Sequence, residues 1–342
     1  MRVNTILTLL TLMAFTANAS ADELIMKNGS RLVGTLVSAE ADVVTFETPL
    51  AGTLAIKQEN IERMVTTSAV TIQMDDGQVF HNRTIDESEG QLIATGEGEP
   101  DAVVTTGDIN MINPEPWKLG NGYGWTGDVS AALESERGNS DTDELDVAAK
   151  TAWRSLVDRY TIRYAQELDK NEGTKTTDNW NARFQYDRFQ ASTGNPTNYW
   201  GGKVWFEYDK FLDLDLRTTV GPHIGRQFVD RSIFNLRGEL GPVYVDERFD
   251  VAEDDDYFGA LWLFEATSDI IGFGTTLYME HDGILNFDET SNLILNTRLG
   301  IKMPLIFGLQ TSFEALWEYD GGAVEGIDEW DETYNFRIGY AW

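Results

Sequence analysis

Histidine is the side chain most often used for acid–base chemistry near neutral pH, and this sequence holds three, His81, His223 and His281. A hydrolase of the serine–histidine–carboxylate kind needs a base histidine beside a nucleophile, and the sequence offers no nucleophile motif near them. We expect His223 to face inward on a β-strand and His281 to lie on the opposite parity near a strand end. His81 is expected on an exposed strand, so we predict no catalytic residue and no metal ligand.

Motifs for other chemistry are also absent from the sequence. It contains no cysteine, which excludes disulfides, thiolate metal sites and a lipid-bearing cysteine. It has no phosphate-binding Walker loop, no dinucleotide glycine pattern and no H-E-x-x-H motif. Clustered carboxylates could bind Ca²⁺ or Mg²⁺, but they lack EF-hand spacing, and we favour a solvated acidic surface without metal or cofactor. These carboxylates, expected in loops, are Glu247, Asp250, Glu253, Asp254, Asp255, Asp256, Asp328, Glu329, Asp331 and Glu332.

The chain is long enough for about two domains and strongly acidic. Its 57 acidic and 26 basic residues give a formal net charge of −31. Nucleic-acid binding needs clustered lysine and arginine, so a nucleic-acid partner is excluded. Such an acidic balance fits a protein that stays hydrated in salt or gathers cations.

The first residues have the pattern of an export signal. Arg2 precedes an apolar run from Ile6 to Phe15, and small residues follow at Ala17, Ala19 and nearby positions. This run is too short to span a bilayer as a helix, and we predict a signal peptide over residues 1–21. No later segment reads as a transmembrane helix, so a membrane could be crossed only by a closed barrel.

A duplicated small β module is predicted over residues 22–113. The hairpin dipeptides Asn28-Gly29 and Asp76-Gly77 lie 48 residues apart, and the sequences around them match in character. Each copy would hold about five short strands in an SH3-like or Sm-like barrel. Prolines at 114 and 116 predict a linker over residues 114–121.

From residue 122 onward the sequence alternates with period two, as a half-apolar strand requires. We count about twelve such segments and predict an antiparallel outer-membrane β-barrel over residues 122–342. In one segment Leu212, Leu214 and Leu216 are assigned to the lipid face. Connections expected at the periplasmic end are short, at 155–158, 229–232, 268–271 and 303–306. Several expected outside are longer and acidic, at 136–144, 169–177, 246–256 and 320–332.

The last strand is aromatic on one face and small or polar on the other. This pattern resembles the C-terminal signal by which bacterial outer-membrane barrels are recognised for assembly. The predicted signal residues are Tyr334, Phe336, Ile338, Tyr340 and Trp342. The expected partners are therefore outer-membrane lipids and the barrel-assembly machinery, with an unknown periplasmic partner for the module.

Charged side chains of both signs fall on the parity opposite to the apolar face and are predicted to line the lumen. They could form a salt-bridged plug or line a narrow wet pore, and their rough balance argues against strong ion selectivity. They are Asp128, Glu134, Lys150, Arg154, Arg163, Glu167, Arg183, Asp187, Lys203, Glu207, Arg217, His223, Arg237, Glu239, Glu265, Arg298, Lys302, Glu314 and Arg337.

The stretch SERGNSDTDELDVAAKTAWRS, residues 135–155, resembles the opening hairpin of the salt-induced outer membrane protein family, domain of unknown function 481. Its Gly138-Asn139-Ser140-Asp141 turn matches that family's turn, and the resemblance covers about residues 117–342. MKNGSRLVGTLVS, residues 26–38, is similar to a small β module found ahead of the barrel in some members. The resemblance implies an outer-membrane location and a link to salt stress, and no known reaction.

The sequence therefore favours a non-catalytic outer-membrane barrel with a role in the envelope or in salt-stress adaptation, and a periplasmic module. The alternative is a narrow porin-like channel for small solutes. An outer-membrane hydrolase is a third hypothesis.

Overall fold

A computed structural model describes residues 21–342 except 41, 89–90, 97, 99, 137–141, 191–196, 231–232, 273 and 324–327, and not the side chains of 134–136. The signal peptide predicted for residues 1–21 and the turn Gly138–Asp141 thus lie outside the described residues, but for Ala21. The described elements are β-strands and three short 3₁₀ helices. No helix among them has the length and apolarity to cross a membrane.

The N-terminal module consists of two units with the same order of elements. The first is β1 (Asp22–Met26), β2 (Arg31–Glu40), β3 (Val43–Thr48), β4 (Gly52–Lys57), η1 (Gln58–Asn60) and β5 (Ile61–Val65). The second is β6 (Val70–Met74), β7 (Val79–Ser88), β8 (Gln91–Thr95), β9 (Ala102–Val104), η2 (Thr106–Asp108) and β10 (Ile109–Ile112). Pairing runs β5-β1-β2-β3-β4 in the first unit and β10-β6-β7-β8-β9 in the second. This arrangement matches the predicted pair of small five-stranded units.

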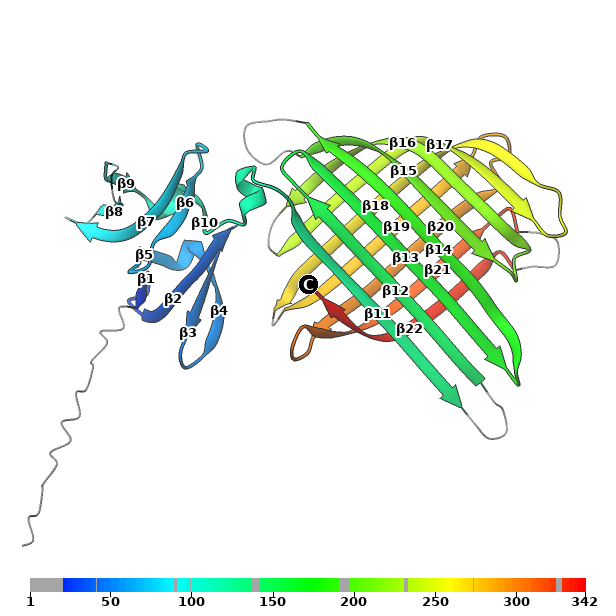
Figure 1. Ribbon diagram of the computed structural model, residues 1–342, viewed down its shortest axis with the longest axis horizontal. Helices are drawn as coiled ribbons and strands as arrows, with labels where there is room; N and C mark the ends of the chain where they lie inside the picture. The colour runs from blue at the N-terminus through cyan, green and yellow to red at the C-terminus, as the bar shows by residue number, and fades with distance from the viewer. Residues whose placement is uncertain are drawn as a thin grey trace, which may run out of the picture.

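The two units share one hydrophobic core. Leu24, Phe46 and Met64 of the first unit pack in the same buried cluster as Ile72 and Ile85 of the second. One backbone bridge, Ile112 with Ala39, also joins β10 to β2. The module is therefore a single folded body built from two similar halves (Figure 1).

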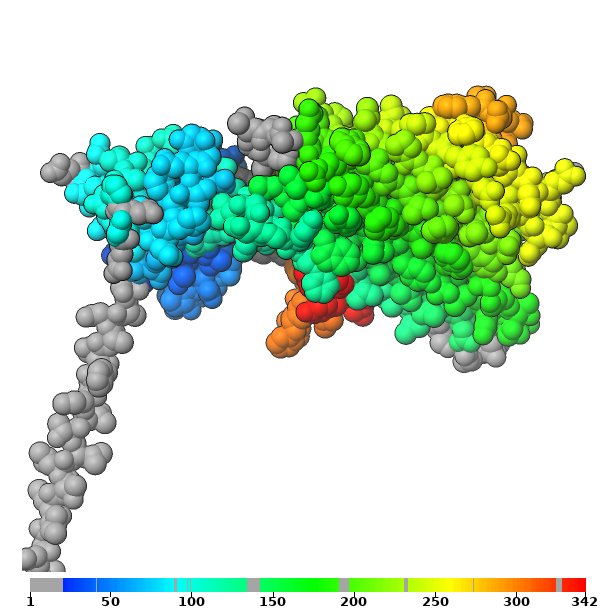
Figure 2. Space-filling model, turned by 45° about the horizontal axis from the view of Figure 1, so that its top comes forward, coloured from blue at the N-terminus to red at the C-terminus, as the bar shows by residue number. Residues whose placement is uncertain are grey.

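A short connection attaches the module to the barrel. The predicted linker contains η3 (Pro116–Leu119), which begins on a proline, as first helical turns allow. Lys118 bonds Glu40 of the module at 2.6 Å, and the Arg154 guanidinium of the barrel lies 5.8 Å from the Trp117 ring. The module and the barrel are neighbouring lobes in Figure 2, and residues of the connection contact both.

The rest of the chain is a closed antiparallel barrel of twelve strands, β11 to β22 in sequence order, as predicted. The first six are β11 (Gly124–Glu136), β12 (Thr142–Arg154), β13 (Asp158–Asn171), β14 (Thr174–Phe189), β15 (Asn198–Asp209) and β16 (Leu214–Asp230). The others are β17 (Phe234–Phe249), β18 (Asp255–Gly272), β19 (Thr275–Asn286), β20 (Leu293–Pro304), β21 (Leu309–Asp320) and β22 (Trp330–Ala341). Because the strand number is even, β11 begins and β22 ends at the same end, here called the near end (Figure 1).

Aromatic side chains on the outside lie in two belts. Near-end pairs include Trp125 with Trp342, ring centroids 5.5 Å apart, and Tyr160 with Tyr186 at 5.0 Å. A far-end pair is Tyr319 with Trp330 at 4.9 Å, and others are Trp180 with Tyr208, Tyr244 with Phe258 and Trp317 with Tyr334. Two aromatic girdles that flank an apolar band are typical of barrels in the outer membrane.

The predicted division into short and long connections was partly wrong. The expected long loop over residues 169–177 is a two-residue turn, because Glu172 and Gly173 both take positive φ and let β13 and β14 continue. The near-end connection 190–197 is longer than the near-end turns 155–157 and 305–308. Within 246–256, Glu247, Asp255 and Asp256 lie on strands β17 and β18.

Two side-chain assignments were also wrong. The register between β15 and β16, and between β16 and β17, shifts next to Leu214. This bulge turns Leu214 inward, where it is 3% exposed, while Arg217 still faces the lumen. His281 is on the outer parity as predicted, but it lies in the middle of β19 and not near its end.

Candidate functional site: the barrel lumen

The structure places the predicted lumen residues on the inner face wherever their side chains are described. Glu134 is outside the described side chains. The others lie on strands of the barrel and form three groups. These are a buried ion-pair cluster, a set of pairs that cross the lumen, and pairs along the barrel wall. The predicted site residues among them are Arg163, Arg183, Asp187, Lys203, Glu207, Arg217, His223, Arg237, Glu239, Arg298, Lys302, Glu314 and Arg337.

The ion-pair cluster surrounds Asp187 and Glu239, whose side chains are fully buried. His223 Nε2 lies 2.7 Å from Asp187 Oδ1, and Lys203 Nζ bonds Glu239 Oε2 at 2.8 Å. Arg159 Nε donates to Asp187 Oδ2 at 2.7 Å. Gln185 and the Tyr199 hydroxyl donate further bonds to Glu239 at 2.8 and 3.0 Å. Each buried carboxylate therefore has both a cation and neutral donors, the condition for burying charge without a large penalty.

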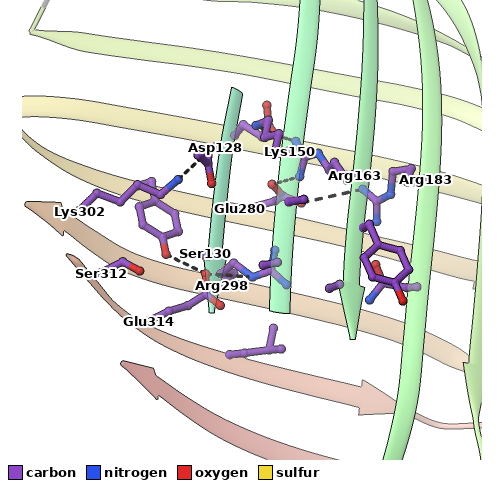
Figure 3. Close-up of a pocket in the computed structure, with 18 of the residues that line it drawn as sticks. Asp128, Ser130, Lys150, Arg163, Arg183, Glu280, Arg298, Lys302, Ser312 and Glu314 are labelled. Carbon is purple, nitrogen blue, oxygen red and sulfur yellow. Dashed lines mark hydrogen bonds and ion pairs between the residues drawn. The ribbon is translucent and has the colours of Figure 1, made fainter. Parts of the chain in front are cut away.

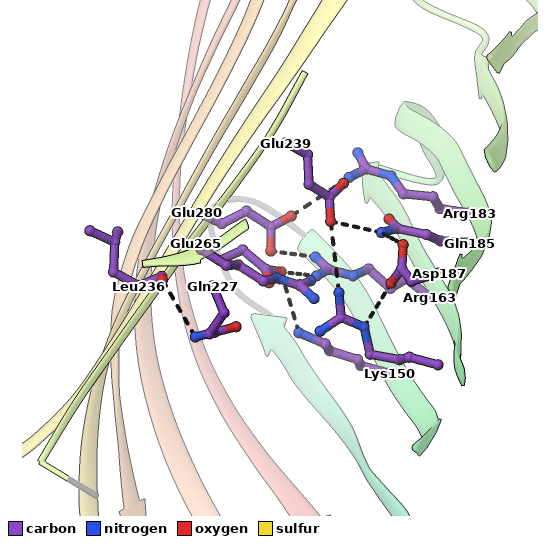
Figure 4. Close-up of polar contacts among 12 residues, drawn as sticks. Lys150, Arg163, Arg183, Gln185, Asp187, Gln227, Leu236, Glu239, Glu265 and Glu280 are labelled. Carbon is purple, nitrogen blue, oxygen red and sulfur yellow. Dashed lines mark hydrogen bonds and ion pairs between the residues drawn. The ribbon is translucent and has the colours of Figure 1, made fainter. Parts of the chain in front are cut away.

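A second set of pairs crosses the lumen. Arg163 on β13 pairs with Glu265 on β18 and Glu280 on β19. Lys150 on β12 lies 3.5 Å from Glu265 (Figure 4). In the closed order of twelve strands, β13 and β19, like β12 and β18, are six positions apart and thus opposite each other.

These pairs show that the barrel is narrow in this direction. A circular barrel of twelve strands, spaced about 4.8 Å apart and tilted by about 40°, would measure about 24 Å across. A paired arginine and glutamate span clearly less than this distance, so the β12–β13 wall lies closer to the β18–β19 wall than a circular section allows. Ion pairs therefore bridge the lumen here.

Further pairs lie toward the last strand and the far end. Along the wall, Arg337 on β22 bonds Glu314 on β21 at 2.7 Å and Asp146 on β12 at 2.7 Å. Near the far end, Arg217 on β16 pairs with Glu247 on the adjacent β17 at 2.5 Å and reaches across the lumen to Asp320 on β21 at 2.8 Å. Glu247, which we expected in an acidic loop, is thus an inward partner of arginine.

An apolar cluster fills part of the lumen and was missed by the sequence analysis. Trp205, Val243, Val245, Leu261 and Ile284 are buried together on the inner face, and Tyr257 and Ile294 join them. The Arg183 guanidinium lies 3.7 Å from the Trp205 ring, which connects this cluster to the charged pairs. Strands β17 and β18 carry apolar residues on both parities, a signal that could have pointed to a filled interior.

The other side of the lumen contains a cavity of about 410 Å³, lined mainly by β11–β14 and β19–β22. Small side chains such as Ser130, Ala148 and Ala152 leave this space open. Lys302 Nζ and Asp128 Oδ1 are 3.1 Å apart in it, and the Tyr278 hydroxyl donates to Glu314 at 2.7 Å (Figure 3). The lumen is thus a polar cavity beside a filled half.

Comparison with known protein families identifies the family of the barrel segment. Residues 129–342 match the family described as "Protein of unknown function, DUF481". The chain belongs to the DUF481 family. No curated protein matches the sequence.

Among solved structures, the DUF481 chain has a similarity to one described as "Unveiling the Mechanism Behind the in-meso Crystallization of Membrane Proteins". The identity is 12%, the TM-score is 0.31, and the match covers 64% of this chain and 83% of that one. A likeness of this degree carries no argument about function.

The DUF481 lumen offers one group with the elements of a metal site. The ligand atoms of Asp187, His223 and Glu239 lie within 4.8 Å of one another. However, Lys203 and Arg159 already neutralise the two carboxylates, and a cation would have to displace them. This group is therefore a charge-balanced ion-pair cluster, and its residues do not fit a resident metal.

The same histidine has one ring nitrogen bonded and the other without a protein partner among the described residues. The bonded nitrogen of His223 points at Asp187, and the other is Nδ1. A catalytic base needs a nucleophile at that second nitrogen. His281 contacts Trp262 at 3.1 Å and Thr297 at 2.9 Å on the outer face, away from the lumen.

The aromatic residues of the last strand lie on the outside of the barrel. Tyr334, Phe336 and Ile338 are 60%, 61% and 57% exposed, as a lipid-facing surface requires. Trp342 is held by two backbone bonds with Gly127, at 3.0 and 3.1 Å. Their predicted role as an assembly signal stays a prediction.

Proposed function

We propose that this chain is a non-catalytic outer-membrane barrel whose lumen is closed to free solute flow, with its module in the periplasm. The observation that carries the closure is the set of ion pairs from Lys150 and Arg163 to Glu265 and Glu280, which join opposite walls. The two aromatic belts and the exposed apolar outer face support insertion in a bilayer.

Conductance in planar bilayers tests the closure. The wild-type protein should give no steps of ionic current. A Lys150→Ala/Arg163→Ala/Arg183→Ala variant should conduct, because the cations that bridge from β12, β13 and β14 to Glu265, Glu280 and Asp282 are removed. Arg188→Ala is the matched control, since Arg188 is 46% exposed at the near end and pairs with Asp158. A silent triple variant would contradict the role of these bridges as the closing element.

The alternative function is a narrow channel for small solutes. The cavity of about 410 Å³, with both signs of charge on its wall, favours this alternative. Discrete conductance of the wild-type protein would select it over the closed barrel.

The physiological role that we propose is envelope maintenance under salt stress. The support is the net charge of −31, which keeps a surface hydrated at high ionic strength. A strain of the source bacterium lacking this protein should admit more of an impermeant dye at high salt than at low salt, and the intact gene should reverse this. Equal dye uptake with and without the protein at every salt concentration would refute the role.

The absence of catalysis is part of the same proposal. Its support is the lack of a nucleophile at His223 among the described residues. Incubation with phospholipid vesicles should release no fatty acid, and any release that His223→Ala abolishes would establish a hydrolase instead.

A further inference from the structure

The seam between the first and last barrel strands is paired over only part of its length. β11 and β22 share four register pairs, from Asp128 with Ala341 to Ala131 with Ile338, plus the two bonds between Gly127 and Trp342. Every other neighbouring pair of barrel strands shares ten or more register pairs. Beyond Ala131 and Ile338, toward the far end, the described residues of the two strands have no pairing with each other.

This gap begins in the apolar band and continues through the far-end belt. The unpaired part of β22 extends from Arg337 to Trp330 and includes Tyr334, whose ring contacts Trp317 in that belt. Its outer flank carries exposed apolar side chains, Phe336 at 61% and Leu133 of β11 at 80%. An open sheet edge facing hydrocarbon leaves backbone groups unsatisfied at several kcal/mol each, so such an edge is tolerated only where it borders a polar cavity.

The lumen cavity borders this gap at one end. The 410 Å³ space reaches the gap at Arg337 of β22 and at Leu316 of β21, the register partner of Thr333, and on β11 it is lined by Ser130, which still belongs to the paired part. Where the cavity borders the gap, no hydrogen-bonded ladder between β11 and β22 separates it from the lipid.

One ion pair spans the seam where the ladder stops. Arg337 directly precedes Ile338, where the pairing of β22 with β11 begins. Asp146 is the β12 partner of Ala132, the first residue of β11 beyond this pairing. Arg337 Nε bonds Asp146 Oδ2 at 2.7 Å, and a second nitrogen approaches at 2.6 Å. Both nitrogens contact the same carboxylate oxygen, and both side chains are about nine-tenths buried, so this charge-assisted pair holds β22 to β12 across β11 from the inside.

The charges that the cavity leaves accessible are mainly cationic. The side chains of Lys150, Arg298 and Lys302 are 43%, 33% and 31% exposed, whereas their partners Glu265, Glu314 and Asp128 are 12%, 5% and 22% exposed. Arg298 Nε lies 3.3 Å from Glu314 Oε2 without the geometry of a hydrogen bond. An exposed carboxylate, Glu318, lines the cavity too, beyond Leu316 toward the far end. A bound anion would therefore lie on the near-end side of Glu318, among Lys150, Arg298 and Lys302, which Figure 3 shows around the cavity.

We propose that the β11–β22 seam is a lateral opening by which the lumen cavity binds an anionic single-chain amphiphile from the membrane. The anionic head meets Lys150, Arg298 and Lys302, the chain lies between Leu133 and Phe336, and the Arg337–Asp146 pair is the latch. This inference rests on the proposed outer-membrane location.

Cysteine pairs test the opening directly, because the chain has no cysteine of its own. Val129 and Tyr340 are register partners, and Leu133 and Phe336 would be the pair of the same parity one repeat beyond the ladder. Under oxidation the Val129→Cys/Tyr340→Cys pair should form a disulfide nearly completely. The Leu133→Cys/Phe336→Cys pair should do so about tenfold more slowly, because bridging fails once Cα atoms are more than about 7 Å apart.

The ligand is tested with a diazirine-bearing alkyl phosphate as probe and an alkyltrimethylammonium of equal chain length as its cationic match. The phosphate should label the seam peptides of β11 and β22 about tenfold more than the ammonium probe does, the discrimination expected for a charge-assisted contact. A short bis-methanethiosulfonate that links Leu133→Cys to Phe336→Cys should abolish the labelling. The same reagent on Val129→Cys/Tyr340→Cys should leave it unchanged.

The latch is tested by Asp146→Asn, which removes the partner across the seam, against Glu247→Gln, which removes a similarly buried carboxylate partner of Arg217 outside the cavity. Asp146→Asn should increase alkyl phosphate labelling, and Glu247→Gln should not. Equal disulfide rates for the two cysteine pairs, or labelling indifferent to head-group charge, would overturn the opening. Disulfide-linked dimers of single Leu133→Cys would also overturn it, since the edge would then accept a second copy of the chain.

The outcomes separate this inference from the proposed function. A barrel that folds, inserts and forms the Val129–Tyr340 link while failing the seam tests loses only the lateral opening. A protein found outside the outer membrane, with no link at Val129 and Tyr340, would overturn both.

Discussion

Replacing Arg163 by methionine should weaken the barrel measurably, because this residue bridges opposite walls. Its guanidinium pairs with both Glu265 and Glu280, and its side chain is 13% exposed. In the variant, Glu265 keeps Arg237 and Lys150, but the nearest remaining cation to Glu280 is Arg183, at 3.9 Å. The loss thus falls mainly on Glu280.

The magnitude follows from breaking a largely buried pair. Removing one partner of a buried pair costs about 3–5 kcal/mol, and the remaining cations and lumen water reduce this to about 2–3 kcal/mol. With a urea dependence of about 2 kcal/mol per molar, the unfolding midpoint should fall by about 1–1.5 M. Lys150→Met is the matched control: its side chain is 43% exposed and its nitrogen lies 3.5 Å from Glu265. Its loss should stay below about 1 kcal/mol, as for solvent-exposed pairs.

The assay is urea unfolding of the detergent-folded protein, followed by the mobility of unheated samples on a gel. A midpoint for Arg163→Met that equals the wild-type value, or that equals the value for Lys150→Met, would refute the bridging role of Arg163. Glu280→Gln and the double variant complete a mutant cycle, in which a coupling of about 1–3 kcal/mol is expected.

Three further predictions concern closure and orientation. Gly127→Ala should reduce the folded fraction, because a Cβ there would lie 2.5 Å from the Trp342 ring. Gly202→Ala should not reduce it, because the nearest atom to a Cβ at that position lies 3.7 Å away. Gel mobility after refolding measures the folded fraction of both variants. Trp342→Ala removes the ring contact with Trp125 at 5.5 Å and should lower the amount in the outer-membrane fraction, measured by immunoblot. Glu253→Cys, in the far-end connection 250–254, should react with an impermeant maleimide on intact cells, and Asp76→Cys of the module only after lysis; the opposite pattern would reverse the proposed orientation.

The barrel was predictable because its signal is local. Alternation with period two requires only that neighbouring side chains point to opposite faces of a strand. A shift of the strand by one residue would move every apolar side chain from the outer face to the lumen, so the pattern assigns each residue to one face. Arg183, Asp187 and Arg337 were placed inward on this basis, and the structure has them inside. The repeat of 48 residues likewise identified the two halves of the module.

What the sequence left open depends on non-local geometry. The bulge beside Leu214 has no marker in residue type, so the parity before it was assigned wrongly. Where β17 and β18 are apolar on both faces, alternation cannot tell Val243 and Leu261 from lipid-facing residues. The Arg163–Glu280 pair and the short β11–β22 ladder depend on the shear of the closed barrel, which no single segment encodes.

The shared core of the module has a consequence for how this part of the chain can vary. Because Leu24 and Met64 pack with Ile72 and Ile85 in one cluster, deleting either half would expose the apolar face of the other to water. The two halves should therefore melt in one transition and resist proteolysis together. A protein that lacked one half of the module would need a second molecule to cover the exposed apolar face of the other half. We therefore expect such a deletion to change the number of subunits before it changes the fold of the remaining half.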